Sequence, residues 1–301
     1  MKRFQKSIAM LVCIAVLCCA VLSQLCISAG AAAPADAAQD DTAVCEAIGS
    51  DSGQGMTTSS SARSFTSGKK TEKPGLADRF YTNFIKDNRF LLLLNGLKNT
   101  LIITLCAMLI GLFFGFLLAI IRVAHDKNGS VRILNLIAKL YITVIRGTPA
   151  SIQLMIIYYV IFASVNINQV LVAVIAFGIN SSAYVAEVVR SGIMSVDAGQ
   201  FEAGKSLGLK FSTTMVNIIL PQAFKNILPA LGNEFISLLK ETSVSGFIGL
   251  MDLTRGGDLI RGITYDAFMP LIAVALIYLV IVIGLSSLVT LMERKLKKNE
   301  R

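Results

Sequence analysis

The chain has 301 residues, of which 54% are hydrophobic and 16% charged, and its mean hydropathy is +0.67. Soluble domains carry roughly 25% charged residues, so this composition argues against a globular cytosolic protein and predicts an integral membrane protein. The net charge of +9 does not indicate nucleic-acid binding, because Lys and Arg are scattered around apolar runs, a pattern typical of cytoplasmic loops in membrane proteins. The single histidine, His125, argues against multi-histidine metal or haem sites, and we predict no metal site.

The first 33 residues predict an export signal or an uncleaved membrane anchor. Lys2, Arg3 and Lys6 precede an uncharged stretch from Ser7 to Ala33, which ends in small residues. This is the arrangement of a secretory signal, and either interpretation places the following segment outside the cell. Residues 34–78 are rich in Ala, Ser, Thr, Gly and Asp, so we expect a disordered extracytoplasmic tether.

The first predicted span of the main domain runs from Asn99 to Ile121, an uncharged stretch long enough to cross a bilayer. Its Gly111 and Gly115 have the spacing that lets another helix approach closely, and we expect that helix to belong to the same molecule. A second apolar segment, Ile133 to Ile145, predicts a helix at the membrane edge.

The edge helix ends at Arg146-Gly147-Thr148-Pro149. We interpret this sequence as a structural turn, in which Pro149 breaks the helix, Gly147 permits the turn and Arg146 reaches to the lipid headgroups.

The uncharged stretch from Gly147 to Ala186 is too long for one crossing. The polar residues 166–169 are expected to divide it into two antiparallel spans. A more polar loop, 191–216, then leads to a span over Ile218 to Leu239, interrupted by prolines, and Ala267 to Met292 forms the last span. The fold class expected from these segments is an all-α integral membrane protein with five core spans plus the N-terminal signal or anchor helix.

Charge predicts the orientation of these spans. The turn at 125–132, the loop at 191–216 and the C-terminal tail at 298–301 are basic, which predicts that all three lie in the cytoplasm. The start of the domain is then outside. The basic residues between Lys69 and Arg89, including Arg79 and Lys86, do not fit this rule.

Residues 199–206 formally match the nucleotide-binding pattern GxxxxGK[ST]. A phosphate-binding loop must follow a buried strand so that its N–H groups converge on the phosphates. Neither the strand nor its acidic partner is present in the pattern, and Glu202 would repel a phosphate. We therefore do not predict a nucleotide site.

The same segment resembles the cytoplasmic loop of the permease subunits of ATP-binding-cassette (ABC) importers, in particular the polar amino-acid uptake family of histidine, glutamine and arginine permeases. The residues that carry the resemblance in this loop are Glu202, Ala203, Gly204, Gly208, Ile218, Leu220 and Pro221. Further matching motifs occur at 95–100, 146–149, 182–187 and 233–243, so the resemblance covers about residues 80–297. Departures are Asp197 where proline is usual, Gly204 where alanine is usual and Glu234 where glutamine is common.

The resemblance implies a permease domain over 79–297, in which Glu202 to Gly208 form a helix that couples to an ATPase. Glu202 would supply charge or a cap, and the small residues Ala203 and Gly204 would allow close approach. Gly208 would form the turn that ends the helix. The alternative is an ordinary amphipathic helix in a loop.

The resemblance also implies the partners of the chain. They are two copies of an ATPase subunit, a second permease copy or homologue, and an extracytoplasmic amino-acid-binding protein. The ATPase subunits would bind ATP and Mg²⁺. The chain itself would be embedded in membrane lipid. The chain itself would bind no cofactor and carry no catalytic residue, and so would not be an enzyme. An ion-coupled secondary amino-acid transporter is the alternative function, although such proteins usually show internal repeats.

Polar residues at membrane depth are candidates for a translocation path, because an amino acid carries both an ammonium and a carboxylate group. The candidates are Glu187, Arg190, Asn233, Glu234, Lys240, Glu241 and Thr242. Charges inside apolar spans are expensive and usually functional. Local pairing is the other interpretation, since Glu187 and Arg190 are three residues apart on one helix.

Overall fold

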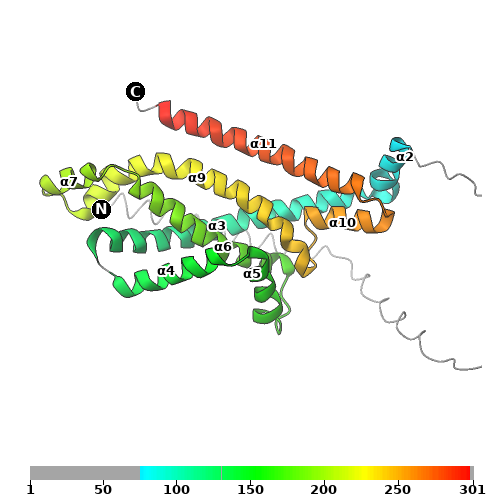
Figure 1. Cartoon of the computed structure of the whole chain (residues 1–301), viewed down its shortest axis with the longest axis horizontal. Coiled ribbons are helices and arrows are strands. Elements are labelled where there is room, and N and C mark those ends of the chain that lie inside the picture. Colours follow the sequence, from blue (N-terminus) through cyan, green and yellow to red (C-terminus); the bar gives the residue numbers. More distant parts are fainter. Residues whose placement is uncertain (1–74, 130, 299–301) are drawn as a thin grey trace, which may run out of the picture.

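The computed structural model describes residues 75–129 and 131–298, and throughout these ranges the regular secondary structure is helical (Figure 1). The predictions for residues 1–33, for the tether up to residue 74 and for residues 299–301 lie outside the described residues. The end of the predicted disordered tether, residues 76–78, is wrong, because these residues belong to a helix. The helical elements are α2 Leu76–Phe80, η1 Tyr81–Ile85, η2 Lys86–Asn88, α3 Phe90–Asn128, α4 Arg132–Gly147, α5 Ala150–Ile156, η3 Ile157–Ile161, α6 Gln169–Met194, α7 Ala198–Ser206, α8 Phe211–Thr214, η4 Met215–Ile219, α9 Leu220–Glu241, η5 Thr242–Ile248, α10 Leu253–Thr264 and α11 Phe268–Lys298.

Three of the described helices, α3, α6 and α11, are long and apolar enough to cross a membrane. The pair formed by α4 and α5–η3, bent by 105°, adds a fourth crossing if it acts as one broken span. The remaining predicted span is α9, which is 22 residues long but contains Lys225, Glu234, Lys240 and Glu241. The chain is thus an all-helical, multi-pass membrane protein in its described part, and the count of five core spans stays a prediction.

The stretch between Gly147 and Ala186 does not form the two straight spans that we expected. Its first part, α5 and η3, is about 18 Å long at 1.5 Å per residue, whereas the hydrocarbon core is about 30 Å thick. Its second part, α6, is a full-length helix, and Asn168 caps it by accepting a hydrogen bond from the Val170 N–H at 2.8 Å. The polar residues 166–169 therefore do separate two elements, but only the second is long enough to cross alone.

The core of the bundle is the crossing of α3 and α6. Gly111 lies against Ser181, and Gly115 lies against Val185; a Cβ atom on either glycine would stand 2.6 Å from the facing side chain. Only glycine permits this approach, since that distance is shorter than real Cβ contacts. The close packing expected from the glycine spacing is therefore confirmed, and it joins two helices of the same chain.

The two ends of the bundle carry different elements (Figure 1). The turn between α3 and α4, the helix α7 and the C-terminal end of α11 lie at one end, whereas α2 and α10 lie at the other. The ammonium group of Lys127 at the end of α3 stands 4.1 Å from the centre of the Phe201 ring in α7. The turn at 125–132, the loop at 191–216 and the C-terminal end of α11 therefore share one side; that this side faces the cytoplasm remains a prediction.

Candidate functional site

The loop at 191–216 contains a short helix with well-defined ends. The Asp197 carboxylate accepts a hydrogen bond from the Gly199 N–H at 2.8 Å and so caps the start of α7. Gly208 has a φ of +70°, a left-handed conformation that ends the helix as expected. Of the two roles predicted for Glu202, charge or a cap, the cap is wrong, because Glu202 lies in the middle of α7 and Asp197 caps its start; the role as a charge stays a prediction.

The inner face of α7 is fixed to the rest of the chain by three contacts. The ring of Phe201 stacks on Phe211 with centroids 6.4 Å apart, and Lys127 lies over the same ring. Gly204 is buried, and a Cβ atom there would stand 2.6 Å from the side chain of Thr214. Gly204 therefore makes a close approach to α8, which follows α7 in the chain.

The outer face of α7 is open. Glu202, Ala203 and Leu207 are exposed, and Leu207 is an apolar side chain with 77% of its surface accessible. Ala203 is available to a partner, and the close approach expected of it stays a prediction. Beyond the loop, Ile218 and Leu220 pack partly on the main core, while Pro221 is exposed in the first turn of α9.

Glu187 and Arg190 form an ion pair near the same end of α6, with a second contact from Arg190 to Asp126 of α3 at 3.4 Å. All three side chains are about one quarter exposed. This geometry is the local pairing that the three-residue spacing allowed, and it ties α6 to α3.

The turn after α4 is built differently from our expectation. Thr148 and Pro149 have extended backbone conformations and make the bend, whereas Gly147 is the last helical residue. The side-chain amide of Gln153 donates to the carbonyl oxygens of Ile145, at 2.7 Å, and Thr148, at 3.1 Å, which the bend leaves without helical partners. Gln153 in turn accepts a hydrogen bond from Asn180 of α6 at 3.0 Å.

Gln153 and Asn180 were not among the predicted site residues. Their only sequence signal is that they are polar amides within the uncharged stretch between Gly147 and Ala186. Buried polar groups in membrane spans usually hydrogen-bond to another helix, and Asn180 is 3% exposed. That signal alone does not indicate which helix provides the partner.

Arg146 lies against α6. Its guanidinium group stands 5.2 Å from the centre of the Tyr184 ring, and Tyr184 lies within α6, ten residues before the helix ends at Met194. That Arg146 reaches the headgroups stays a prediction. The contact with Tyr184 forms because α4 packs against α3 and α6 (Figure 1) and so carries its C-terminal end into the bundle. Arg146 lies within electrostatic range of Glu187 and Glu234.

The candidate residues of α9 fall into two groups. Glu234 and Glu241 are half-buried and interact electrostatically, being two turns apart on one face of the helix. Asn233 and Lys240 are exposed in the single chain. Thr242 is fully buried and its hydroxyl donates to the Leu239 carbonyl oxygen at 2.8 Å; its assignment to the path stays a prediction.

An apolar helical bundle with one short helix exposed at its end is the arrangement of a multi-pass membrane protein. Residues 111–298 match the family of binding-protein-dependent transport system inner membrane components, and the chain belongs to this family. The arginine transport system permease protein ArtQ of Bacillus subtilis (strain 168) is 40% identical over 210 residues, which are 69% of this chain and 94% of that protein.

A second relative, the glutamine transport system permease protein GlnP of Escherichia coli (strain K12), is 38% identical over 209 residues, covering 68% of this chain and 93% of that protein. Among solved structures, a crystal structure of an amino acid ABC transporter with histidines matches with a TM-score of 0.64 and 44% identity, over 70% of this chain and 98% of that one. The chain is thus a permease subunit of an ABC importer, and the comparisons do not favour an ion-coupled secondary transporter.

Proposed function

We propose that this subunit moves polar amino acids across the cytoplasmic membrane by alternating access, driven by ATP hydrolysis in a separate subunit. The amino-acid substrate is supported by the arginine and glutamine permeases that the chain is similar to. The observation that carries the coupling mechanism is the geometry of α7. Because Phe201, Phe211 and Lys127 fix its inner face, a force on its outer face would move the attached helices as a rigid body.

The outer face of α7 is the proposed contact with the ATPase. Leu207 would enter an apolar groove of that partner, and Glu202 would add charge beside it. An exposed leucine on a polar loop is stabilised when a partner covers it. Two ATPase copies, each with ATP and Mg²⁺, would act on a pair of permeases made of this chain and a second copy or homologue. An extracytoplasmic binding protein would deliver the amino acid at the opposite end.

The proposed translocation path runs between α4–α6 and α9. Arg146 carries a positive charge beside α6, and Glu234 and Glu241 carry acidic groups on the facing helix. A zwitterionic amino acid needs both signs, so Arg146 would bind its carboxylate and the acidic pair its ammonium group. Asn233 and Lys240, exposed in the single chain, would face the path or the second permease.

The coupling proposal is tested with two variants of the outer face, Leu207→Glu and Glu202→Arg, in the purified transporter. We expect both to reduce co-purification of the ATPase and amino-acid-stimulated ATP hydrolysis. Ile263→Glu is the matched control, because Ile263 is an exposed apolar residue on α10 at the other end of the bundle. Normal ATPase binding and stimulation in both α7 variants would refute the assignment of α7. Uptake that persists in cells lacking the ATPase would refute ATP-driven import.

A further inference from the structure

We propose that residues 75–85 form a membrane anchor that lies in the lipid interface of the leaflet remote from α7, held to the protein by Arg79, Asn83 and Asp266. This segment, α2 and η1, precedes the residues that match the transport family. The inference does not depend on the substrate or on the coupling mechanism.

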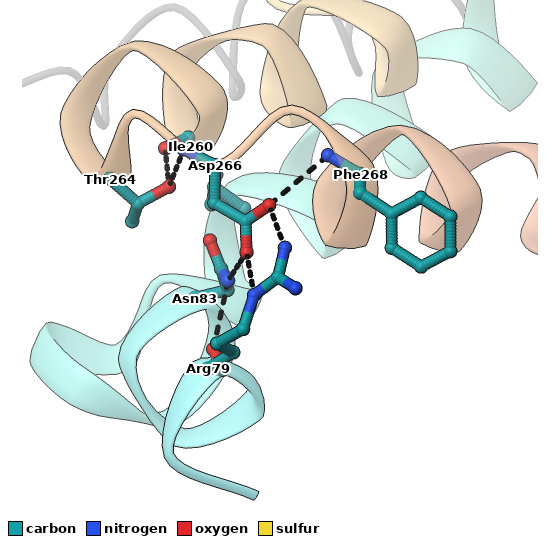
Figure 2. A network of polar contacts seen from close by, with 6 residues as sticks. All are labelled: Arg79, Asn83, Ile260, Thr264, Asp266 and Phe268. Carbon is teal, nitrogen blue, oxygen red and sulfur yellow. Dashed lines mark hydrogen bonds and ion pairs between the residues drawn. The ribbon is translucent and has the colours of Figure 1, made fainter. Parts of the chain in front are cut away.

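A polar latch joins α2–η1 to the corner between α10 and α11 (Figure 2). The Arg79 guanidinium donates twice to the Asp266 carboxylate, at 3.0 and 2.6 Å. Asn83 donates to the same carboxylate at 2.9 Å and to the Arg79 carbonyl oxygen at 2.8 Å. The carboxylate also accepts from the Phe268 N–H, at 3.2 Å, where α11 begins. Paired donors of this kind fix orientation as well as distance.

An apolar contact supports the latch from the other side. Phe84 is buried in a small cluster with Leu93 of α3 and Val274 of α11. The segment is therefore attached to the first turns of two membrane-spanning helices and lies at the level where both begin. In Figure 1, α2 runs across the direction of α3 and α11, as a helix in the plane of a membrane surface would.

Most of the exposed side chains of this segment are apolar; Asp78 and Thr82 are its exposed polar residues. Leu76, Phe80, Tyr81 and Ile85 are each at least half exposed in the single chain, at 70%, 51%, 55% and 50%. The exposed apolar surface continues into the first turns of the spanning helices through Phe90, Leu91 and Leu94 of α3 and Phe268, Leu271 and Ile272 of α11. Lipid covers the surface of the spans, so continuity assigns the same occupant to α2–η1. Aromatic residues are enriched at this depth of the bilayer.

Two of the basic residues that did not fit the charge rule are paired with carboxylates. Arg79 is paired with Asp266, and Arg89 is paired with Asp87 at 2.9 Å and donates to the Thr82 carbonyl oxygen at 2.8 Å. These guanidinium groups therefore have structural partners at this end of the protein. Lys86 is exposed beside the apolar side chains, where its ammonium group would meet lipid phosphates.

The absence of tryptophan from the whole sequence allows a direct test with the full chain in vesicles. A single tryptophan is introduced by Phe80→Trp, and emission and quenching by lipids brominated at different acyl-chain depths are measured. Leu279→Trp on the exposed face of α11 calibrates deep burial, and Leu207→Trp on α7 calibrates exposure to water. We expect Phe80→Trp to emit at shorter wavelength than Leu207→Trp and to be quenched most by bromine near the headgroups.

The latch is tested by adding Asp266→Asn to Phe80→Trp. We expect lower fluorescence anisotropy of the tryptophan, with emission of Leu279→Trp unchanged by the same substitution. Efficient acrylamide quenching of Phe80→Trp without quenching by bromolipids would overturn the proposal and favour a soluble partner on this surface. Unchanged anisotropy after Asp266→Asn would show that the polar latch does not hold the segment.

Discussion

The amide nitrogen of Gln153 in α5 lies 2.7 Å from the carbonyl oxygen of Ile145 in α4, across a bend of 105° between the two helices. A bend of this size leaves backbone carbonyl groups without their helical donors, which is costly at membrane depth. Gln153 supplies the missing donor, and Asn180 of α6 fixes the glutamine in place. Two side-chain amides therefore stabilise the bend between α4 and α5.

We predict that Gln153→Glu destabilises the bend, because a carboxylate accepts hydrogen bonds and cannot donate to the Ile145 and Thr148 carbonyl oxygens. The loss of unfolding free energy should be about 1–3 kcal/mol, measured by thermal denaturation in detergent. Gln222→Glu is the matched control, since Gln222 makes one exposed bond to the Ile218 carbonyl oxygen. Equal effects of the two substitutions would contradict this account.

Arg146 should recognise the substrate carboxylate. Arg146→Gln is expected to raise KM for the transported amino acid by about 10- to 100-fold, the equivalent of about 1.5–3 kcal/mol for a lost charge-assisted hydrogen bond. The same variant should no longer discriminate the amino acid from its amide, which lacks the negative charge. Uptake kinetics in proteoliposomes measure both. Lys139→Gln, an exposed basic position on the same helix, should leave discrimination intact.

A substitution at Thr214 should compensate for a larger side chain at Gly204. Gly204→Ala places a Cβ atom 2.6 Å from the Thr214 side chain, and overpacking of this kind costs about 1–3 kcal/mol. Adding Thr214→Ala removes the clashing atoms and should restore most of the lost stability and ATPase coupling. A double-mutant cycle in detergent measures the interaction. Additive effects of the two substitutions would mean that α7 and α8 do not share this contact.

The crossing of α3 and α6 should be intolerant of larger side chains. We expect Gly111→Ala to destabilise the protein by about 1–3 kcal/mol, because Ser181 occupies the space of the new methyl group. Gly284→Ala in α11 has no atom within 4 Å of the new Cβ, so it should be neutral or slightly stabilising through helix propensity. The two variants are compared by their midpoints of thermal unfolding. A lower midpoint for Gly284→Ala than for Gly111→Ala would contradict the packing argument.

The latch between Arg79 and Asp266 should be insensitive to pH over the physiological range. Hydrogen bonds from Arg79 lower the pKa of the Asp266 carboxyl to about 2. The pKa of an aspartate in the unfolded chain is about 4. Because the folded value is lower, the stabilisation by this pair is complete above about pH 4 and is lost as the pH falls from about 4 through about 2. Hydrogen exchange of residues 75–85, corrected for its intrinsic rate, should therefore be constant between about pH 5 and 8. Asp266→Asn should accelerate it at every pH.

The sequence alone was sufficient for those features that arise from local pattern. Apolar runs of spanning length predicted α3, α6 and α11, the glycine spacing predicted a close crossing, and the motif at 202–208 predicted a short helix that ends at Gly208. Each follows from composition, periodicity or backbone freedom within one stretch of chain, and the motif also indicated the transport family.

The tertiary structure alone decided which groups meet. The sequence indicated no partner for Arg146, but α4 packs along α3 and α6 and brings its guanidinium group to the Tyr184 ring. Gln153 and Asn180 became partners only through the bend between α4 and α5. Arg79 and Asp266 are 187 positions apart, so no local pattern links them. Contacts of this kind depend on how helices pack against one another, and that packing is the sum of many weak interactions spread over the whole chain.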